Sequence, residues 1–176
     1  MTNQFAEMLS VGGKSNSLGK VSEIIDATLS DQSRLNELYE CLFDDDAWVR
    51  MRAADAIEKV CRQKPDWLLS YIDKFIAKLA ESNQPSIQWH LSQIYAQVDL
   101  TLTQKQFVIK WLENLLANSR IDWIVAANAM DTLAQFTRDG SFKKDKMLAL
   151  LAIQQQHKSN AVVRRATKLL TELSAK

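Results

Sequence analysis

The sequence predicts an all-α fold of stacked helix pairs, and three observations lead to this prediction. Apolar residues follow helical spacing throughout, without the sustained alternation that indicates strands. The four glycines and two prolines interrupt none of these helical patterns. Four segments superimpose at spacings of 38, 38 and 37 residues, and they start at Val49, Ile87, Val125 and Val162. An internal period of this size is typical of repeats that stack into a solenoid.

Each of the four segments carries one apolar face. Its apolar residues stand at the starting position and then four, eight and eleven residues further on, which is helical spacing. The four sets are Val49/Ala53/Ile57/Val60, Ile87/Leu91/Tyr95/Val98, Val125/Ala129/Leu133/Phe136 and Val162/Ala166/Leu170/Leu173. We therefore expect these residues to form the core side of the second helix in each pair.

A first helix is predicted ahead of each of these segments. The four first helices cover about residues 31–43, 65–81, 102–117 and 142–157. Pro65 and Pro85 stand where helices begin, because the first turn needs no N–H from these positions. The run Asp44–Asp46, and Thr101 or Thr103, can accept hydrogen bonds from the free N–H groups of the helices that follow. These signals support one helix pair per repeat.

The N-terminal part precedes the repeats. Residues 18–29 form an amphipathic segment that we expect to cover the apolar end of the stack, as terminal units of solenoids must. Phe5 and Leu9 allow a short helix packed on it, or a frayed terminus. The predicted organisation is a single domain with an N-terminal segment and capping helix at 1–30 and four repeats at 31–176. The repeats cover about 31–63, 64–100, 101–138 and 139–176.

The composition narrows the classes of partner. With 22 basic and 21 acidic residues the formal net charge is +1, which argues against nucleic acid or an anionic membrane as the main partner. No apolar stretch is long enough to cross a membrane and no basic leader precedes an apolar run, so we expect a soluble, cytoplasmic protein. Cys41 and Cys61 belong to no CxxC or Cys/His pattern. We expect buried thiols, no metal and no cofactor.

One repeat resembles a known family. Residues 46–57, Asp-Ala-Trp-Val-Arg-Met-Arg-Ala-Ala-Asp-Ala-Ile, resemble the second helix of a HEAT repeat, with its Asp, its Val-Arg and its paired Ala. Gln88 and Ala126 replace the arginine in the next two repeats. The resemblance extends over about residues 31–173. It implies a right-handed α-solenoid with second helices lining a concave face, an arginine that ties adjacent repeats together, and no catalytic residues.

Polar positions recur in register with the repeats and predict a binding groove. They stand three, six and ten residues after each start: Arg52/His90/Asn128/Arg165, Asp55/Gln93/Asp131/Lys168 and Lys59/Gln97/Gln135/Glu172. Tryptophan beside arginine and amide groups is typical of binding surfaces. The predicted partner-binding residues are Trp48, Arg52, Asp55, Lys59, Trp89, His90, Gln93, Asn128, Asp131, Arg165 and Lys168. The simpler alternative is a solvated helix face, with tryptophans that staple helix starts.

Two functions from different classes fit this pattern. The first is a non-catalytic scaffold that holds a protein or peptide in the concave groove. The alternative is a HEAT-like DNA-binding protein or alkylpurine DNA glycosylase, whose residue types occur at Trp48, Arg52, Asp55, Trp89 and Asp131. The charge balance counts against this alternative, because phosphate contacts dominate DNA affinity. A third function, an accessory subunit like HEAT-type bilin lyases, rests on fold analogy alone. No residue is assigned a catalytic role.

Overall fold

The computed structural model describes residues 3–12 and 17–175 of the 176-residue chain. In these ranges the chain forms ten α-helices and three 3₁₀ segments and contains no strand, which confirms the all-α prediction. The α-helices are α1 Gln4–Ser10, α2 Val21–Ser30, α3 Leu35–Glu40, α4 Ala47–Gln63, α5 Ile72–Leu79, α6 Pro85–Gln97, α7 Leu102–Leu116, α8 Trp123–Arg138, α9 Lys144–Gln154 and α10 Asn160–Ser174. The 3₁₀ segments are η1 Gln32–Arg34, η2 Cys41–Phe43 and η3 Pro65–Tyr71.

The helices gather into two compact units. Unit 1 comprises the described part of Met1–Tyr71 together with Ser82–Asp99, and unit 2 comprises Ile72–Glu81 with the described part of Leu100–Lys176. The predicted first helix at 65–81 is divided by this arrangement, because η3 belongs to unit 1 and α5 to unit 2. Residues 1–2 and 13–16 of the predicted N-terminal segment lie outside the described residues.

Helix starts carry the capping residues that the sequence indicates. The Asp46 carboxylate accepts a hydrogen bond from the Trp48 amide at 2.8 Å at the start of α4. Of the two threonines, Thr101 caps α7, where it forms a capping box with Gln104. Pro85 is the first residue of α6. Side-chain oxygens of this kind satisfy N–H groups that have no partner inside the helix.

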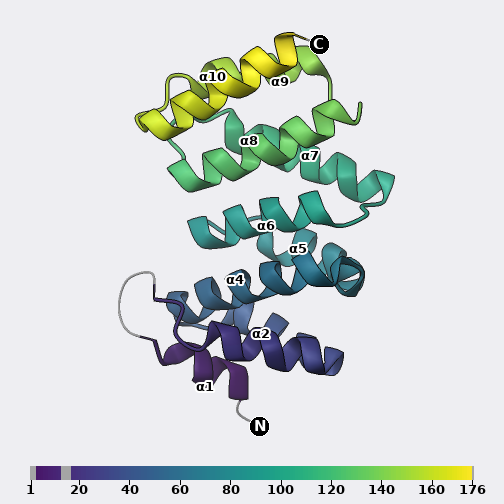
Figure 1. Cartoon of the computed structure of the whole chain (residues 1–176), viewed down its shortest axis with the longest axis vertical. Coiled ribbons are helices and arrows are strands. Elements are labelled where there is room, and N and C mark those ends of the chain that lie inside the picture. Colours follow the sequence, from purple (N-terminus) through teal and green to yellow (C-terminus); the bar gives the residue numbers. More distant parts are fainter. Residues whose placement is uncertain (1–2, 13–16, 176) are drawn as a thin grey trace. The chain divides into compact units, whose positions relative to one another are not determined.

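The core of unit 1 surrounds α4, which packs against α2 and α6 (Figure 1). Both predicted apolar sets of this unit are buried: the set from Val49 to Val60 lies on α4, and the set from Ile87 to Val98 lies on α6 and its C-cap. The segment before the first repeat is also packed. Helix α1 lies against α3 and α4, and its Phe5 and Leu9 are fully buried. Burial of these side chains anchors the N-terminal helix to the repeats.

The core of unit 2 surrounds α8, which packs against α7, α9 and α10 (Figure 1). The predicted set on α8 is buried throughout. On α10 the buried residues are Val162, Ala166, Leu169 and Leu173, whereas the predicted Leu170 is only half-buried. Steps of three and four residues both keep helical register, so the sequence could not choose between Leu169 and Leu170.

Among the described residues, two glycines adopt a positive φ, and the difference in their surroundings leads to a testable prediction. Gly19 has φ 53° and Gly140 has φ 81°. A Cβ on Gly19 would lie 2.5 Å from the Val11 carbonyl oxygen, whereas one on Gly140 would meet nothing within 4 Å. We expect Gly140→Ala to cost about 1 kcal/mol for the backbone conformation alone. Gly19→Ala should cost clearly more in urea unfolding, and equal costs for the two variants would contradict this expectation.

Candidate functional site

The predicted groove residues fall into two groups, one on each unit. Trp48, Arg52, Asp55, Lys59, Trp89, His90 and Gln93 belong to unit 1, on α4 and α6. Asn128, Asp131, Arg165 and Lys168 belong to unit 2, on α8 and α10. All eleven lie on second helices, as the spacing indicates. A single concave groove and a right-handed solenoid stay predictions.

Arg52 departs most from the expected exposure. Its side chain is 1% exposed, and its guanidinium donates hydrogen bonds to the carbonyl oxygens of Leu9 at 2.5 Å, Gly12 at 2.9 Å and Ser17 at 2.9 Å. The expectation of an exposed Arg52 is therefore corrected, since the chain's own N-terminal segment covers it. Helical periodicity cannot detect this cover, because the segment lies more than thirty residues away in the sequence.

His90 is also buried rather than exposed. Its Nδ1 lies 3.2 Å from Oε1 of Gln93, and its ring contacts the Trp89 ring at a centroid distance of 5.0 Å. Burial lowers the pKa of His90 to about 4, although Asp55 and Glu58 act in the opposite direction. The ring is therefore neutral at neutral pH and packs as part of the interior.

This shift predicts a pH dependence of stability. The ordinary histidine pKa is about 6.5, so between about pH 6.5 and 4 the unfolded chain binds a proton that the folded chain does not. Stability therefore falls as the pH drops through this window, by about 1 kcal/mol between about pH 7.5 and 5.5. His90→Gln should remove this component when urea unfolding is compared at the two pH values. An unchanged difference between the two pH values in His90→Gln would contradict the assignment.

Several other polar residues on α4 and α6 pair with each other. Lys59 Nζ lies 2.7 Å from Oδ2 of Asp55 on the next turn of α4. Glu58 is buried and accepts hydrogen bonds from Arg62 at 2.6 Å and from Gln97 at 2.8 Å. Gln97 belongs to α6 and thereby links the two second helices of unit 1. Trp89 and Gln93 are half-buried.

Trp48 lies beside a shallow pocket at the starts of α4 and α6. Its side chain is 39% exposed, and the pocket of about 270 Å³ is lined by Ala47, Trp48, Arg50, Met51, Gln84 and Ser86. Arg50 donates to the Gln84 side chain at 2.7 Å and to the Asp44 carbonyl at 2.6 Å. Arg50 thus ties one repeat to the next, as the family resemblance implies. Trp48 is the one large aromatic group in this lining.

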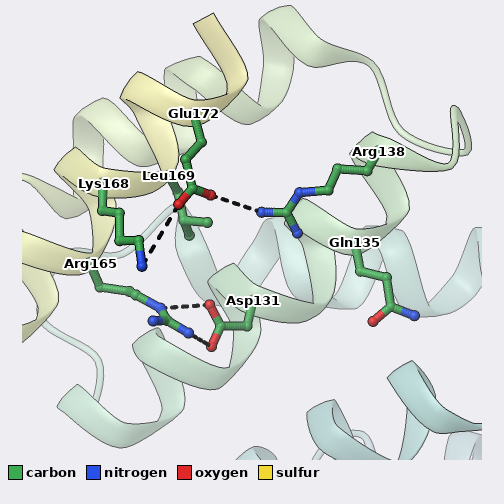
Figure 2. Close-up of a pocket in the computed structure, with 7 residues that line it drawn as sticks. All are labelled: Asp131, Gln135, Arg138, Arg165, Lys168, Leu169 and Glu172. Carbon is green, nitrogen blue, oxygen red and sulfur yellow. Dashed lines mark hydrogen bonds and ion pairs between the residues drawn. The ribbon is translucent and has the colours of Figure 1, made fainter. Parts of the chain in front are cut away.

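Unit 2 brings three of its four predicted residues together. Asp131, Arg165 and Lys168 line a pocket of about 360 Å³ between α8 and α10, with Gln135, Arg138, Leu169 and Glu172 (Figure 2). We call this the α8–α10 pocket. Asn128 lies outside its lining and donates a hydrogen bond to the Ile124 carbonyl at 2.8 Å.

Ion pairs connect the two helices across the α8–α10 pocket. Arg165 donates from Nε to Asp131 at 2.7 Å and from Nη2 to the second oxygen of the same carboxylate. The hydrogen bond that Arg165 donates to the Asp131 carboxylate raises the pKa of Arg165. Glu172 lies between Arg138 and Lys168, with N–O distances of 3.2 and 3.8 Å (Figure 2). Three cationic and two anionic side chains therefore share one exposed pocket.

Sequence reasoning missed part of this pocket. Arg138 stands seven residues after Asp131, so helical spacing places both on one face of α8. Gln135 and Glu172 belong to a recurring polar column but were not among the predicted site residues. A count of charge along the chain would have drawn attention to this region.

The net charge of the whole chain is close to zero because the two units carry net charges of opposite sign. Unit 1 has 8 basic and 13 acidic residues and a net charge of −5, whereas unit 2 has 14 basic and 8 acidic residues and a net charge of +6. The argument from net charge against an electrostatic partner therefore does not hold for unit 2. A basic unit attracts anions in general, so the charge of each unit has to be considered separately.

Both cysteines are free and buried. Burial raises the pKa of Cys41 and of Cys61 to about 12, so both remain protonated thiols. Within residues 3–12 and 17–175, no group of His, Cys, Asp or Glu is arranged to hold a metal ion. Among the helices of those ranges, none combines the length and apolarity that a membrane crossing requires.

A comparison with known protein families identifies the family of this chain. Residues 5–118 match the HEAT repeat domain, a segment that runs from α1 to the end of α7. No curated protein and no solved structure matches the chain. The α8–α10 pocket lies beyond the matched segment, so the family assigns no role to its residues. The match covers more than half of the chain, and the chain therefore belongs to the HEAT repeat domain family.

Proposed function

We propose that this protein is a non-catalytic scaffold that binds a segment of a protein partner on its exposed second-helix surfaces. HEAT repeat domains are typically protein-interaction scaffolds. The observation that carries the proposal is the α8–α10 pocket, in which two neighbouring helices present arginine, lysine, amide and carboxylate groups around an open volume. Such groups orient a partner through hydrogen bonds, and arginine is enriched where binding energy concentrates.

The ion pairs of this pocket do not prevent partner binding. Arg165 and Arg138 are 43% and 44% exposed, and the carboxylates that they contact are 40% and 44% exposed. An exposed ion pair contributes only about 0–1 kcal/mol to stability. A partner can therefore replace one carboxylate by another at little cost in free energy.

Trp48 supplies a second contact in the proposal. An exposed tryptophan beside Met51 offers a large apolar area with few rotatable bonds. Tryptophan is among the residues that most often dominate binding energy at interfaces. Arg52 and His90 are left out of the proposed contact set, because both are buried.

The DNA glycosylase alternative receives less support. Arg52, one of the five residues that motivated it, is engaged by backbone carbonyls of the chain itself. Trp48, Asp55 and Trp89 belong to unit 1, whose net charge of −5 repels phosphate. A protein partner is the better account.

Site-specific photo-cross-linking in cells tests the proposal. A photoreactive phenylalanine analogue at Gln135 or at Trp48 should cross-link one defined partner protein, because both positions border the proposed surfaces. The control position is Leu102, which is 75% exposed on α7. The Gln135 adduct should disappear when Arg138 and Lys168 are both changed to Glu. Equal labelling from Leu102, or an adduct that survives the double substitution, would refute the proposal.

A further inference from the structure

We propose that the α8–α10 pocket binds an acidic segment of the partner, whose carboxylates pair with Arg138, Arg165 and Lys168. This inference rests on the proposed function and adds the chemical class of the bound segment. It goes beyond what the HEAT repeat match provides, since the pocket lies outside the matched residues.

The arrangement of charges inside the pocket leaves room for further carboxylates. Within the described part of the chain, Glu172 pairs with both Arg138 and Lys168, so two cations share one anion. Lys168 is 66% exposed and its contact with Glu172 is 3.8 Å long, which leaves its ammonium largely in water. An incoming carboxylate can pair with either of these cations, and a further one can replace Asp131 at Arg165 at little cost in free energy, because that pair is exposed.

The net charge of unit 2 also favours the binding of an acidic segment. Unit 2 carries a net charge of +6, whereas the pocket residues alone sum to +1. Charges beyond the pocket attract an anionic segment over a Debye length of about 10 Å at moderate salt. Short-range pairing in the pocket then fixes the position of the segment, because guanidinium groups bind carboxylates in a planar, two-point geometry.

A protein segment fits these features better than nucleic acid. Asp131 and Glu172 lie within the pocket and repel a continuous line of phosphates. An acidic peptide can place single carboxylates at the cations and neutral residues beside the two carboxylates. The alternation of charge in the pocket therefore favours a polypeptide partner, and a nucleic acid becomes an outcome of the test.

The binding test uses the full chain and a fluorescein-labelled peptide of alternating Glu and Gly, with a Gln/Gly peptide as the matched probe. Fluorescence anisotropy at about 50 mM salt keeps electrostatic attraction strong. Arg165→Gln with Lys168→Gln should weaken binding of the Glu/Gly peptide about tenfold or more, because charge-assisted contacts are lost. Lys110→Gln with Lys158→Gln, two exposed positions of the same unit, should weaken it less than about threefold.

A second pair of variants should act in the opposite direction. Glu172→Gln frees Arg138 and Lys168 for the peptide, and we expect binding about threefold tighter or more. Glu81→Gln changes the charge of unit 2 by the same amount at an exposed turn and should have a smaller effect. Thermal unfolding by circular dichroism checks that each variant is folded.

Several results would overturn the inference. They are an affinity weaker than about 1 mM for the Glu/Gly peptide, equal affinity for the Gln/Gly peptide, equal effects of pocket and control variants, or tighter binding of a single-stranded DNA oligonucleotide. Failure of the proposed function looks different. If Gln135 gives an adduct that the double substitution removes, but the cross-linked segment is not acidic, the scaffold proposal stands and only this inference fails. If no partner cross-links, the scaffold proposal itself fails.

Discussion

Replacing Arg52 with Ala should lower the free energy of unfolding by about 3–5 kcal/mol. The guanidinium donates to the three carbonyl oxygens of Leu9, Gly12 and Ser17 from a position that is 1% exposed. A hydrogen bond from a charged donor contributes about 1.5–3 kcal/mol, and a buried carbonyl that loses its donor adds a desolvation cost. Losses at one shared group are not additive, which keeps the total below the sum of the three.

The loss of stability in Arg52→Ala should be greatest around α1. Without the guanidinium, the carbonyl groups of Leu9, Gly12 and Ser17 lose the hydrogen bonds that hold them to α4. Urea unfolding should report the change in free energy, and hydrogen exchange should show reduced protection in α1. Arg52→Lys should recover only part of the stability, because an ammonium cannot direct a planar fork of donors at three oxygens.

Arg164→Ala provides the matched control for Arg52. Arg164 is exposed on α10, and removal of an exposed side chain usually changes stability by no more than about 0.5 kcal/mol. A loss below about 1 kcal/mol for Arg52→Ala, or an equal loss for both arginines, would show that the three hydrogen bonds do not anchor Leu9, Gly12 and Ser17 to α4.

Phe75→Ala should be similarly destabilising, by about 3–5 kcal/mol. Phe75 is fully buried on α5, which packs against α7 within unit 2. Truncation of a buried phenylalanine removes its transfer free energy and leaves a cavity that the neighbouring helices fill only in part. Protection against hydrogen exchange should be lost first in α5 and α7.

Phe107→Ala makes the same substitution at an exposed phenylalanine. It therefore separates the effect of burial from the effect of replacing Phe with Ala. Phe107 is 41% exposed on α7 of the same unit, and we expect its truncation to cost less than about 1 kcal/mol. Urea unfolding of the two variants gives the comparison. Similar losses, or a loss of protection confined to α4 and α6 in Phe75→Ala, would contradict the assignment of α5 to unit 2.

The local features of this chain follow from its sequence. Apolar spacing places Val49, Ile87 and Val125 at buried positions, and residues such as Asp46 and Thr101 mark where helices begin. These features depend on residues a few positions apart, whose relation is fixed by helix geometry. The family follows for the same reason, because the pattern of each helix repeats along the chain.

The exposure of side chains on the polar faces of the second helices depends on the tertiary structure. Arg52 and Arg165 occupy equivalent positions in their repeats, yet the first is buried by the N-terminal segment and the second is exposed in a pocket. A repeat pattern predicts the helix face on which a side chain lies. It does not predict which distant segment covers that face. Burial depends on contacts across many residues, and the sequence period carries no information about them.

The candidate site also has features that follow from the sequence and features that depend on the tertiary structure. The sequence by itself determined the helix face on which Asp131, Arg165 and Lys168 lie. Only the tertiary structure joined them to Arg138 and Glu172 and separated a basic unit from an acidic one. Pairing of side chains depends on how α8 packs against α10, and packing is set by the whole core rather than by the period of either helix.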